Sequence, residues 1–398
     1  MRVQETSARI EPARIEPIPG PLADRVADLA TKTVLLDRRL HPKTAASLAD
    51  VVCVMNTYYS NLIEGHHTLP RDIENALAGE LSPEGERRDL QLEAAAHVRV
   101  QKEIERLAET NALPEPASRE FLRWIHREFY RDAPDSMLDI HDATHEFRMV
   151  PGEWRNSRKH DVMVGRHVPP SSERVAEFMA YFENRYRFEK MGTAARVLAM
   201  ASAHHRFNYI HPFPDGNGRV SRLMSHAMAL HAGVAAHGLW SVSRGLARGL
   251  SSRTEYKTMM DRADSPRAGD LDGRGNLSLR ALIEFSEWFL DVCIDQVDFM
   301  SNLFDLDNLS RRLANYVKQS EHLRAESTAL LDEALRRGEF ERGEAPRITG
   351  LPERTARRVL VDTVDAGLLQ SQTPKGAVSL RFPVDTLDAL FPRLYPLS

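Results

Sequence analysis

The 398-residue chain has only two cysteines, Cys53 and Cys293, which are too far apart to suggest a disulfide framework. It has no apolar run of membrane-spanning length, and its start lacks the basic-then-apolar pattern of a signal peptide. A net charge of −4 argues against a protein that coats nucleic acid without specificity. These absences lead us to expect a soluble cytoplasmic protein with no membrane partner.

The length allows two or three domains and at least one sizeable core. Between about residues 22 and 310 apolar residues recur with the helical period of 3.6. The clearest helical segments are 45–63, 90–107, 118–130, 173–188, 193–208, a segment from just after Gly218 to residue 232, and 279–300. The valine-rich segment 162–168 is the best strand candidate. We therefore predict a mainly α protein with a small β-hairpin.

The two ends of the chain differ from this helical body. The first twenty residues are rich in proline and repeat Ala-Arg-Ile-Glu-Pro at 8–12 and 13–17, which predicts a mobile extended arm, with docking of the arm on the body or on a partner as the alternative. After a linker helix near 305–322, the tail has the helix, short helix, helix and two β-like runs of a winged helix-turn-helix. The predicted division is an arm at 1–40, a helical domain at 41–310, and a linker helix with the winged helix at 311–398.

Glycines in the run His-Pro-Phe-Pro-Asp-Gly-Asn-Gly-Arg-Val-Ser-Arg, at 211–222, indicate a phosphate-binding loop. Gly216, Asn217 and Gly218 directly precede a predicted helix. Glycines let the backbone approach a ligand closely, and the free amides at a helix start bind phosphate oxygens.

Charged side chains in the same run complete the predicted site. Arg219 and Arg222 are three residues apart, so both can reach anionic oxygens from one helix. Asp215 offers the hard oxygen ligand that Mg²⁺ prefers. His211 titrates near neutrality and can take a proton from an attacking hydroxyl. The run therefore predicts a nucleotide polyphosphate site with a base beside it.

The run resembles the motif of the Fic family, H-x-F-x-(D/E)-G-N-G-R-x-x-R, at every specified position. The family has a helical core with a short β-hairpin flap, and most characterised members transfer AMP from ATP to a protein hydroxyl. The resemblance implies that His211 activates the target hydroxyl and that Asp215 holds Mg²⁺. It also implies that the glycine loop and Arg219 bind the phosphates, with Arg222 at the γ-phosphate of ATP.

The resemblance extends over about residues 45–300. Residues 152–155 and 162–170 are similar to the family's flap, which would place Val164 and Gly165 at the nucleotide and would pair with an extended target segment; the alternative is a simple surface hairpin. Tyr256 is similar to an aromatic residue near the adenine, with core packing an equal alternative. A kinase-like branch has a basic residue where this chain has Gly218, so glycine there favours nucleotidyl transfer.

An inhibitory pattern of the family, (S/T)-x-x-x-E-(G/N), is matched by Ser60 to Glu64 and the following glycine, on a helix predicted near 45–64. A glutamate at that helix end can pair with Arg222 and occupy the receptor for the γ-phosphate. ATP would still bind, but its α-phosphate would be misaligned for attack. The alternative to an inhibitory role is that this segment is an ordinary helix end with a glycine cap.

The leading prediction is a Mg²⁺- and ATP-dependent protein adenylyltransferase that Glu64 inhibits. Two alternatives stay open: a de-AMPylating hydrolase in which this glutamate orients water, and a DNA-binding regulator that only senses the nucleotide. The expected partner is a protein substrate, which includes the chain itself, and a homodimer is left open. DNA is weakly supported, because residues 320–398 hold eleven Lys/Arg against twelve Asp/Glu. Docking of a protein on the winged helix is therefore an open alternative to DNA binding.

Overall fold

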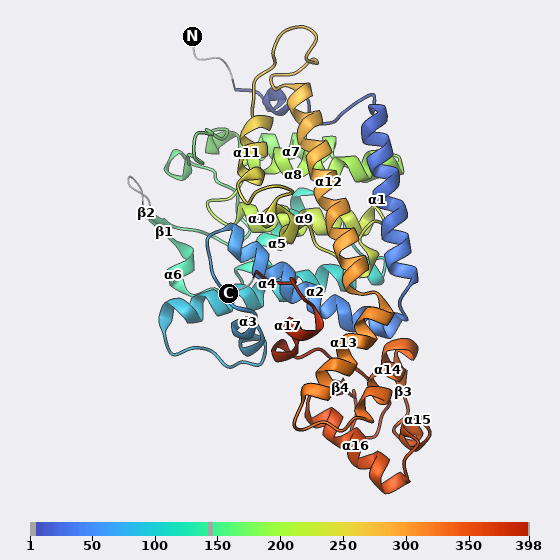
Figure 1. Cartoon of the computed structure of the whole chain (residues 1–398). Coiled ribbons are helices and arrows are strands. Elements are labelled where there is room, and N and C mark those ends of the chain that lie inside the picture. Colours follow the sequence, from blue (N-terminus) through green and yellow to red (C-terminus); the bar gives the residue numbers. More distant parts are fainter. Residues whose placement is uncertain (1–4, 142–145, 397–398) are drawn as a thin grey trace. The chain divides into compact units, whose positions relative to one another are not determined.

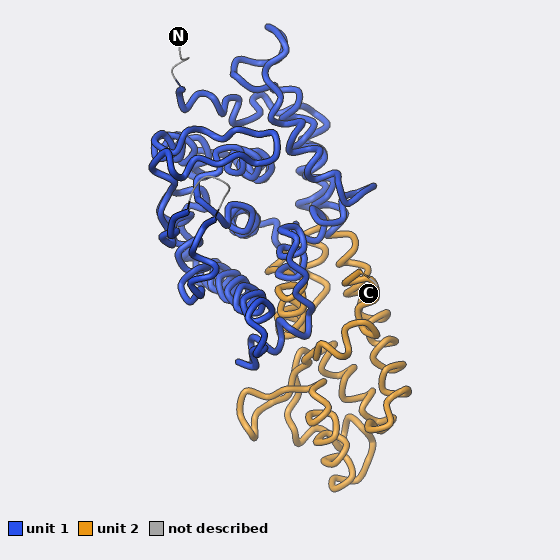
Figure 2. Tube along the Cα trace, turned by 90° about the vertical axis from the view of Figure 1, so that its left-hand side faces the viewer, with its two compact units in different colours: residues 1–31, 56–235, 241–296 blue, residues 32–55, 236–240, 297–398 orange. Residues whose placement is uncertain are grey.

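The computed structural model describes residues 5–141 and 146–396. The chain forms two compact units (Figure 2): unit 1 contains residues 1–31, 56–235 and 241–296, and unit 2 contains residues 32–55, 236–240 and 297–398. Three long helices contribute residues to both units: α1 (Gly20–Arg38), α2 (Pro42–Ile63) and α12 (Leu279–Leu303). Within α2, residues 56–63 belong to unit 1.

Unit 1 is mainly helical (Figure 1), which confirms the predicted fold class. Its other helices are α3 (Pro70–Leu77), α4 (Gly85–Glu109), α5 (Arg119–Phe129), α6 (Asp135–Leu138), α7 (Val175–Arg185), α8 (Thr193–Ile210), α9 (Asn217–His231), α10 (Val242–Arg248) and α11 (Glu255–Ala263). Short 3₁₀ turns lie at Ser7–Ile10, Arg158–His160, Ser172–Arg174 and Phe188–Lys190.

Helices α8 and α9 form the centre of unit 1 and pack against each other. Most side chains of both helices are buried, on all sides of each helix. A helix that is buried all round belongs to the middle of a domain, not to its surface. The loop that joins α8 to α9 is the predicted site, so it is held between the two most buried helices.

The strand predicted at 162–168 is wrong. The structure has only an isolated antiparallel bridge there, between Val164 and His167. Gly165 has a φ of +60° and turns the chain so tightly that these two residues pair with each other. A β-hairpin does form elsewhere, from β1 (Asp139–His141) and β2 (Glu146–Arg148), which the sequence pattern did not indicate.

The prediction of a mobile N-terminal arm is also wrong for the described residues 5–17, which lie on unit 1. Ile10 and Ile15, the isoleucines of the two repeats, are buried together with Ala13. Arg206 donates to the carbonyl of Pro12 over 2.9 Å. Each repeat thus supplies one apolar anchor, and buried polar groups of the domain bond the backbone between them.

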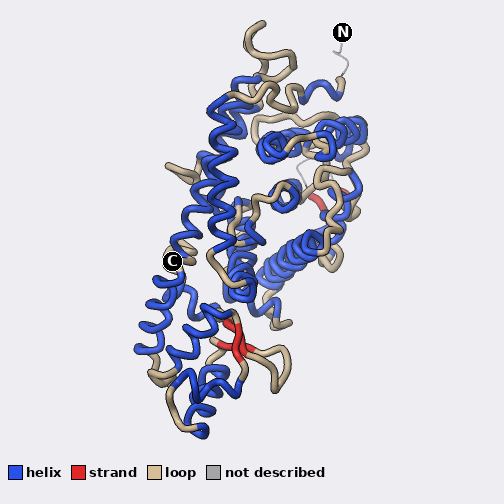
Figure 3. Tube along the Cα trace, turned by 90° about the vertical axis from the view of Figure 1, so that its right-hand side faces the viewer, coloured by secondary structure: helices blue, strands red, loops and turns tan. Residues whose placement is uncertain are grey.

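Unit 2 contains a helical module with a small sheet (Figure 3). Its elements are α13 (Leu306–Gln319), α14 (Ser327–Arg337), β3 (Glu339–Phe340), α15 (Ala345–Thr349), α16 (Glu353–Asp365), β4 (Leu369–Gln370), β5 (Val378–Leu380) and α17 (Leu387–Leu390), with 3₁₀ turns at Ala236–Gly238, Arg342–Glu344 and Val384–Thr386. The strands pair antiparallel in the order β3-β5-β4. The predicted helices and strands occur in the predicted order, and β3 and α17 are additions to it.

Helix α16 of this module has two different faces. Ala356, Val359 and Leu360 are buried, whereas Arg354, Arg357 and Arg358 are exposed.

In the part of the chain that the structure describes, no helix is both long enough and apolar enough to cross a membrane.

Candidate active site

The run 211–222 forms the loop between α8 and α9 and the first turns of α9, and the loop has a fixed conformation. The Asn217 side chain accepts a bond from the N–H of Phe213 (2.9 Å) and donates to its carbonyl (2.8 Å), which ties the two ends of the turn together. Phe213, the predicted anchor, is fully buried and stacks on His126 with ring centres 3.9 Å apart. Trp154 lies on Phe213 at 4.5 Å.

His211 occupies an unusual backbone position at the C-terminal end of α8. Its φ of +50° lies in the left-handed region, which is uncommon for a residue other than glycine and recurs at functional sites. Burial and the positive charge of Arg155 lower the pKa of His211 to about 4. The imidazole is therefore neutral at physiological pH and can accept a proton.

Arg155 holds this strained segment in place. Its guanidinium is 1% exposed, and it donates to the carbonyls of His211 (2.7 Å), Ile210 (3.2 Å) and Pro170 (3.0 Å). It also bonds Ser172 Oγ at 2.7 Å, and its own N–H donates to the carbonyl of Pro212. One buried side chain thus joins the end of α8 to Pro170 and Ser172.

Asp215 lies at the exposed side of the loop, with half of its side chain accessible. Tyr130 donates to Asp215 Oδ2 at 2.7 Å, and Arg219 approaches the same oxygen at 3.3 Å. Burial alone would raise the pKa of Asp215, but Arg219 and Tyr130 outweigh it and lower that pKa. An ionised carboxylate that is bonded at one oxygen and open to solvent fits a Mg²⁺ ligand.

The two glycines of the loop leave no room for larger side chains. Gly216 has a φ of +78°, and a Cβ added there would lie 2.8 Å from Tyr130 Oη. A Cβ at Gly218 would lie 2.9 Å from Arg222 Nη1 and would collide with Glu64 Oε1. The structure thus brings Glu64 directly against the predicted phosphate loop.

Arg222 is bonded to the C-terminal end of α2 and to the residue after it by three hydrogen bonds. Arg222 Nη2 donates to Glu64 Oε1 at 2.6 Å and to the carbonyl of Ser60 at 3.1 Å. Arg222 Nε donates to Ser60 Oγ at 2.9 Å. Burial would raise the pKa of Glu64, but Arg222 and then Arg219 lower it, so the carboxylate is ionised. The pair predicted from the sequence is therefore present.

Tyr256 is half-buried. Burial raises the pKa of its hydroxyl, the charge of Arg222 lowers that pKa, and the charge of Glu64 raises it. Its ring is parallel to that of Trp288 within 16°, with ring centres 6.3 Å apart. Its hydroxyl lies 2.8 Å from Nε2 of His204, whose other nitrogen lies 2.9 Å from Ser225 Oγ. Ser225 donates to the carbonyl of Ser221, so it accepts from His204 Nδ1 and Tyr256 donates to Nε2.

Val164 and Gly165 lie in the short turn that the structure has in place of a flap strand. Val164 is 41% exposed. The turn is held at its end by His167, whose Nε2 lies 2.7 Å from the carbonyl of Tyr209, two residues before His211. The turn is thus attached next to the loop, and inside it the N–H and carbonyl of Val164 are both bonded to His167.

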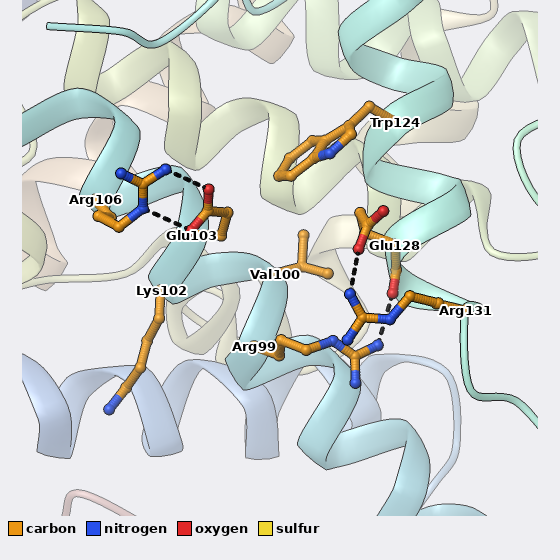
Figure 4. A pocket seen from close by; sticks show the side chains of 8 residues that line it. All are labelled: Arg99, Val100, Lys102, Glu103, Arg106, Trp124, Glu128 and Arg131. Atoms are coloured by element: carbon orange, nitrogen blue, oxygen red, sulfur yellow. Dashed lines mark hydrogen bonds and ion pairs between the residues drawn. The ribbon is translucent and has the colours of Figure 1, made fainter. Parts of the chain in front are cut away.

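A separate groove of about 560 Å³ lies between α4 and α5 (Figure 4). It is lined by Arg99, Val100, Lys102, Glu103, Arg106, Trp124, Glu128 and Arg131. Arg106 pairs with Glu103 at 2.7 Å and Arg131 with Glu128 at 2.9 Å, so the two carboxylates of the groove pair with two of the four cations that line it. Its lining includes none of the predicted site residues, and we assign it no part in the chemistry.

The sequence did not indicate Tyr130, Glu93, His126 or His204 as parts of the site. Glu93, His126 and His204 lie on helices α4, α5 and α8, and Tyr130 directly follows α5. They come to the site only through the tertiary fold. Arg155 was noted within the flap pattern, but its bonds to the loop were not expected. The useful signal would have been polar residues on otherwise apolar helix faces, because buried polar groups need partners.

Comparison with known proteins identifies relatives of this site. Residues 116–229 match the Fic/DOC family model. An 83-residue stretch is 40% identical to protein adenylyltransferase Fic of Drosophila melanogaster, and 41% identical to that of Drosophila yakuba. The match covers 21% of this chain and 17% of each fly protein, so this chain spans under one fifth of their length.

Two crystal structures show a similar fold. A Fic domain containing signaling protein from Bacteroides thetaiotaomicron has a TM-score of 0.51 and 20% identity, over 70% of this chain and 97% of the other. A Fic family protein from Desulfovibrio desulfuricans has a TM-score of 0.51 and 17% identity, over 92% of this chain and 97% of the other. The second similarity includes most of the length of this chain.

Proposed function

Because the chain is a Fic family protein with its Fic domain at residues 116–229, we propose that it is a protein adenylyltransferase that Glu64 holds in an inhibited state. The observation that carries this proposal is the contact of the inhibitory segment with Arg222, beside a complete loop of residues 211–222. The substrate would be ATP, and the acceptor a Ser, Thr or Tyr hydroxyl of a protein.

The chain's own residues can perform the transfer. His211, neutral because of its lowered pKa, takes the proton of the target hydroxyl as that oxygen attacks the α-phosphorus. The bond from the α-phosphorus to the bridging oxygen breaks, and pyrophosphate leaves. The amides at the start of α9 and the guanidinium of Arg219 stabilise the charge on the phosphates.

Mg²⁺ would be held by Asp215 and would supply charge neutralisation on the leaving pyrophosphate. Tyr130 and Arg219 fix the Asp215 carboxylate from the side of the protein. The acceptor hydroxyl would be presented by a target segment that lies along the exposed turn at Val164 and Gly165, and backbone pairing there would require the bonds between Val164 and His167 to open. Tyr256, whose hydroxyl is fixed by His204, would contact the adenine.

Inhibition follows from competition for one guanidinium. Arg222 is 1% exposed and donates three bonds to Ser60 and Glu64 in this structure. A γ-phosphate needs the same donors and carries the same sign of charge as Glu64, so the two exclude each other. ATP bound without Arg222 would have its α-phosphate out of line with the attacking hydroxyl.

The test is to follow which part of the nucleotide reaches protein. We expect the Glu64→Gly variant with Mg²⁺ to transfer label to protein from α-labelled ATP and not from γ-labelled ATP. The double variant Glu64→Gly/His211→Ala should transfer neither. Transfer of the γ-label would contradict adenylyl transfer, and loss of label from a pre-AMPylated protein on adding wild type would favour the hydrolase instead.

A further inference from the structure

Glu93 is a buried carboxylate outside the 211–222 run, on helix α4, with only 3% of its side chain exposed. Its Oε1 lies 3.0 Å from Arg219 Nη2 of the loop. Its Oε2 lies 3.0 Å from Nδ1 of His66, the second residue after Glu64. One carboxylate therefore contacts both the active-site loop and the inhibitory segment.

Glu93 completes the set of contacts that orient Arg219. At the other end of the guanidinium, Nη1 meets Tyr130 Oη at 2.9 Å and Asp215 Oδ2 at 3.3 Å. Burial lowers the pKa of Arg219, but Tyr130, Glu93 and Asp215 together raise it above its usual value. Loss of Glu93 would leave a buried cation without its counter-ion on one side, which is costly and frees that end to move. Asp215 would then lose a fixed neighbour.

The contact with His66 gives the inhibitory segment a second attachment. The N–H of His66 donates to the carbonyl of Asn61 (2.9 Å), so His66 is part of the turn that ends α2. Glu64 attaches this turn to Arg222, and His66 attaches it through Glu93 to Arg219. The charged groups that face His66 are Glu93, Arg219 and Glu64.

We propose that Glu93 is a positioning residue that orients Arg219 and Asp215 for catalysis, and that it anchors the inhibitory turn through His66. The proposal rests on the proposed function for its kinetic readouts. The proposal has two halves, and they predict opposite changes in labelling activity. Loss of the Glu93–Arg219 pair lowers the activity of the released enzyme, whereas loss of the His66–Glu93 contact raises the activity of the inhibited enzyme.

The first half is tested in the Glu64→Gly background, where inhibition is already removed. Glu93→Gln keeps the shape of the side chain and removes its charge. We expect kcat to fall about 10- to 100-fold, as for other residues that support a metal ligand. The Mg²⁺ concentration that gives half of the maximal rate should rise. Glu93→Asp should restore part of kcat. Glu103→Gln, a half-exposed carboxylate on the same helix that pairs with Arg106, is the control. Equal kcat for Glu93→Gln and the background would overturn this half.

The second half is tested with Glu64 intact. His66→Asn should raise basal labelling severalfold in wild type and should change nothing in Glu64→Gly, whereas the exposed neighbour in His67→Asn should be silent in both. The bond to Glu93 raises the pKa of His66, so the anchor is strongest when His66 is protonated. Basal labelling relative to Glu64→Gly should therefore rise with pH through that pKa, and this rise should be absent in His66→Asn.

A measurement without activity separates this proposal from the proposed function. Histidine-selective NMR of the full chain should show that the pKa of His66 falls toward its ordinary value in Glu93→Gln. The unfolding transition of each variant confirms that it is folded. An unchanged His66 pKa would overturn the anchor even if no variant labelled protein. A silent Glu64→Gly variant with a shifted His66 pKa would instead contradict the proposed function.

Discussion

Replacement of Ser60 by alanine should release the enzyme in part. Ser60 Oγ accepts a 2.9 Å bond from Arg222 Nε, and both groups are buried. A hydrogen bond to a charged group contributes about 1.5–3 kcal/mol, and each 1.4 kcal/mol corresponds to a tenfold change in an equilibrium. Alanine suits a helix at least as well as serine, so α2 itself is not weakened. If the bond exists only in the inhibited state, the released fraction should increase about 10- to 100-fold.

The assay is the initial rate of protein labelling from α-labelled ATP at saturating Mg²⁺. The bonds of Arg222 to Glu64 and to the Ser60 carbonyl persist in Ser60→Ala, so its rate should lie between wild type and Glu64→Gly. Ser136→Ala, which removes an exposed bond to Asp89, is the matched control and should behave as wild type. A rate for Ser60→Ala equal to that of wild type, with Glu64→Gly fully released, would refute the reasoning.

Three further predictions concern other parts of the molecule. Arg155→Met should lower the free energy of unfolding by at least about 3 kcal/mol, because several buried carbonyls lose their donor. A denaturant titration checks this, with the exposed Arg158→Met as control. A loss of stability no larger than that of the control would contradict the stabilising role of the Arg155 bonds. The rate of Glu64→Gly should keep its plateau below neutral pH and fall only near the His211 pKa of about 4, because the base must be neutral; an acid limb centred near 6.5 in the pH–rate profile would count against this histidine environment. If unit 2 contacts DNA through α16, Arg357→Ala should weaken binding of the chain to its own promoter DNA in a salt-dependent mobility-shift assay, and an unchanged shift would argue for protein docking.

Local sequence patterns were sufficient for the parts of the site that act within one segment. The loop 211–222 and the end of α2 each hold their chemistry within a few residues, so each could be recognised by itself. Helix positions followed from apolar periodicity for the same reason. The loop and the helix positions need no knowledge of what packs against them. The contact of Glu64 with Arg222 joins residues 158 positions apart, and it was predicted from the resemblance to the family.

Features that depend on distant partners could not be predicted in the same way. Arg155 lies 56 residues from His211, and the sequence gives no sign that its guanidinium bonds that carbonyl. The segment 162–168 has β-branched residues, but a strand needs a neighbour, and the tight turn at Gly165 pairs Val164 with His167 instead. The N-terminal repeat resembled a free arm because the surface that buries Ile10 and Ile15 is formed by residues far along the chain.

The central claim is that Glu64 inhibits a complete transferase by holding Arg222. The most direct measurement is the rate of α-label transfer to protein by Glu64→Gly compared with wild type at equal ATP and Mg²⁺. The account predicts a low rate for wild type and a large increase for Glu64→Gly, because Arg222 then becomes available to the γ-phosphate. A Glu64→Gly variant that is folded, binds ATP and labels protein no faster than wild type would contradict it.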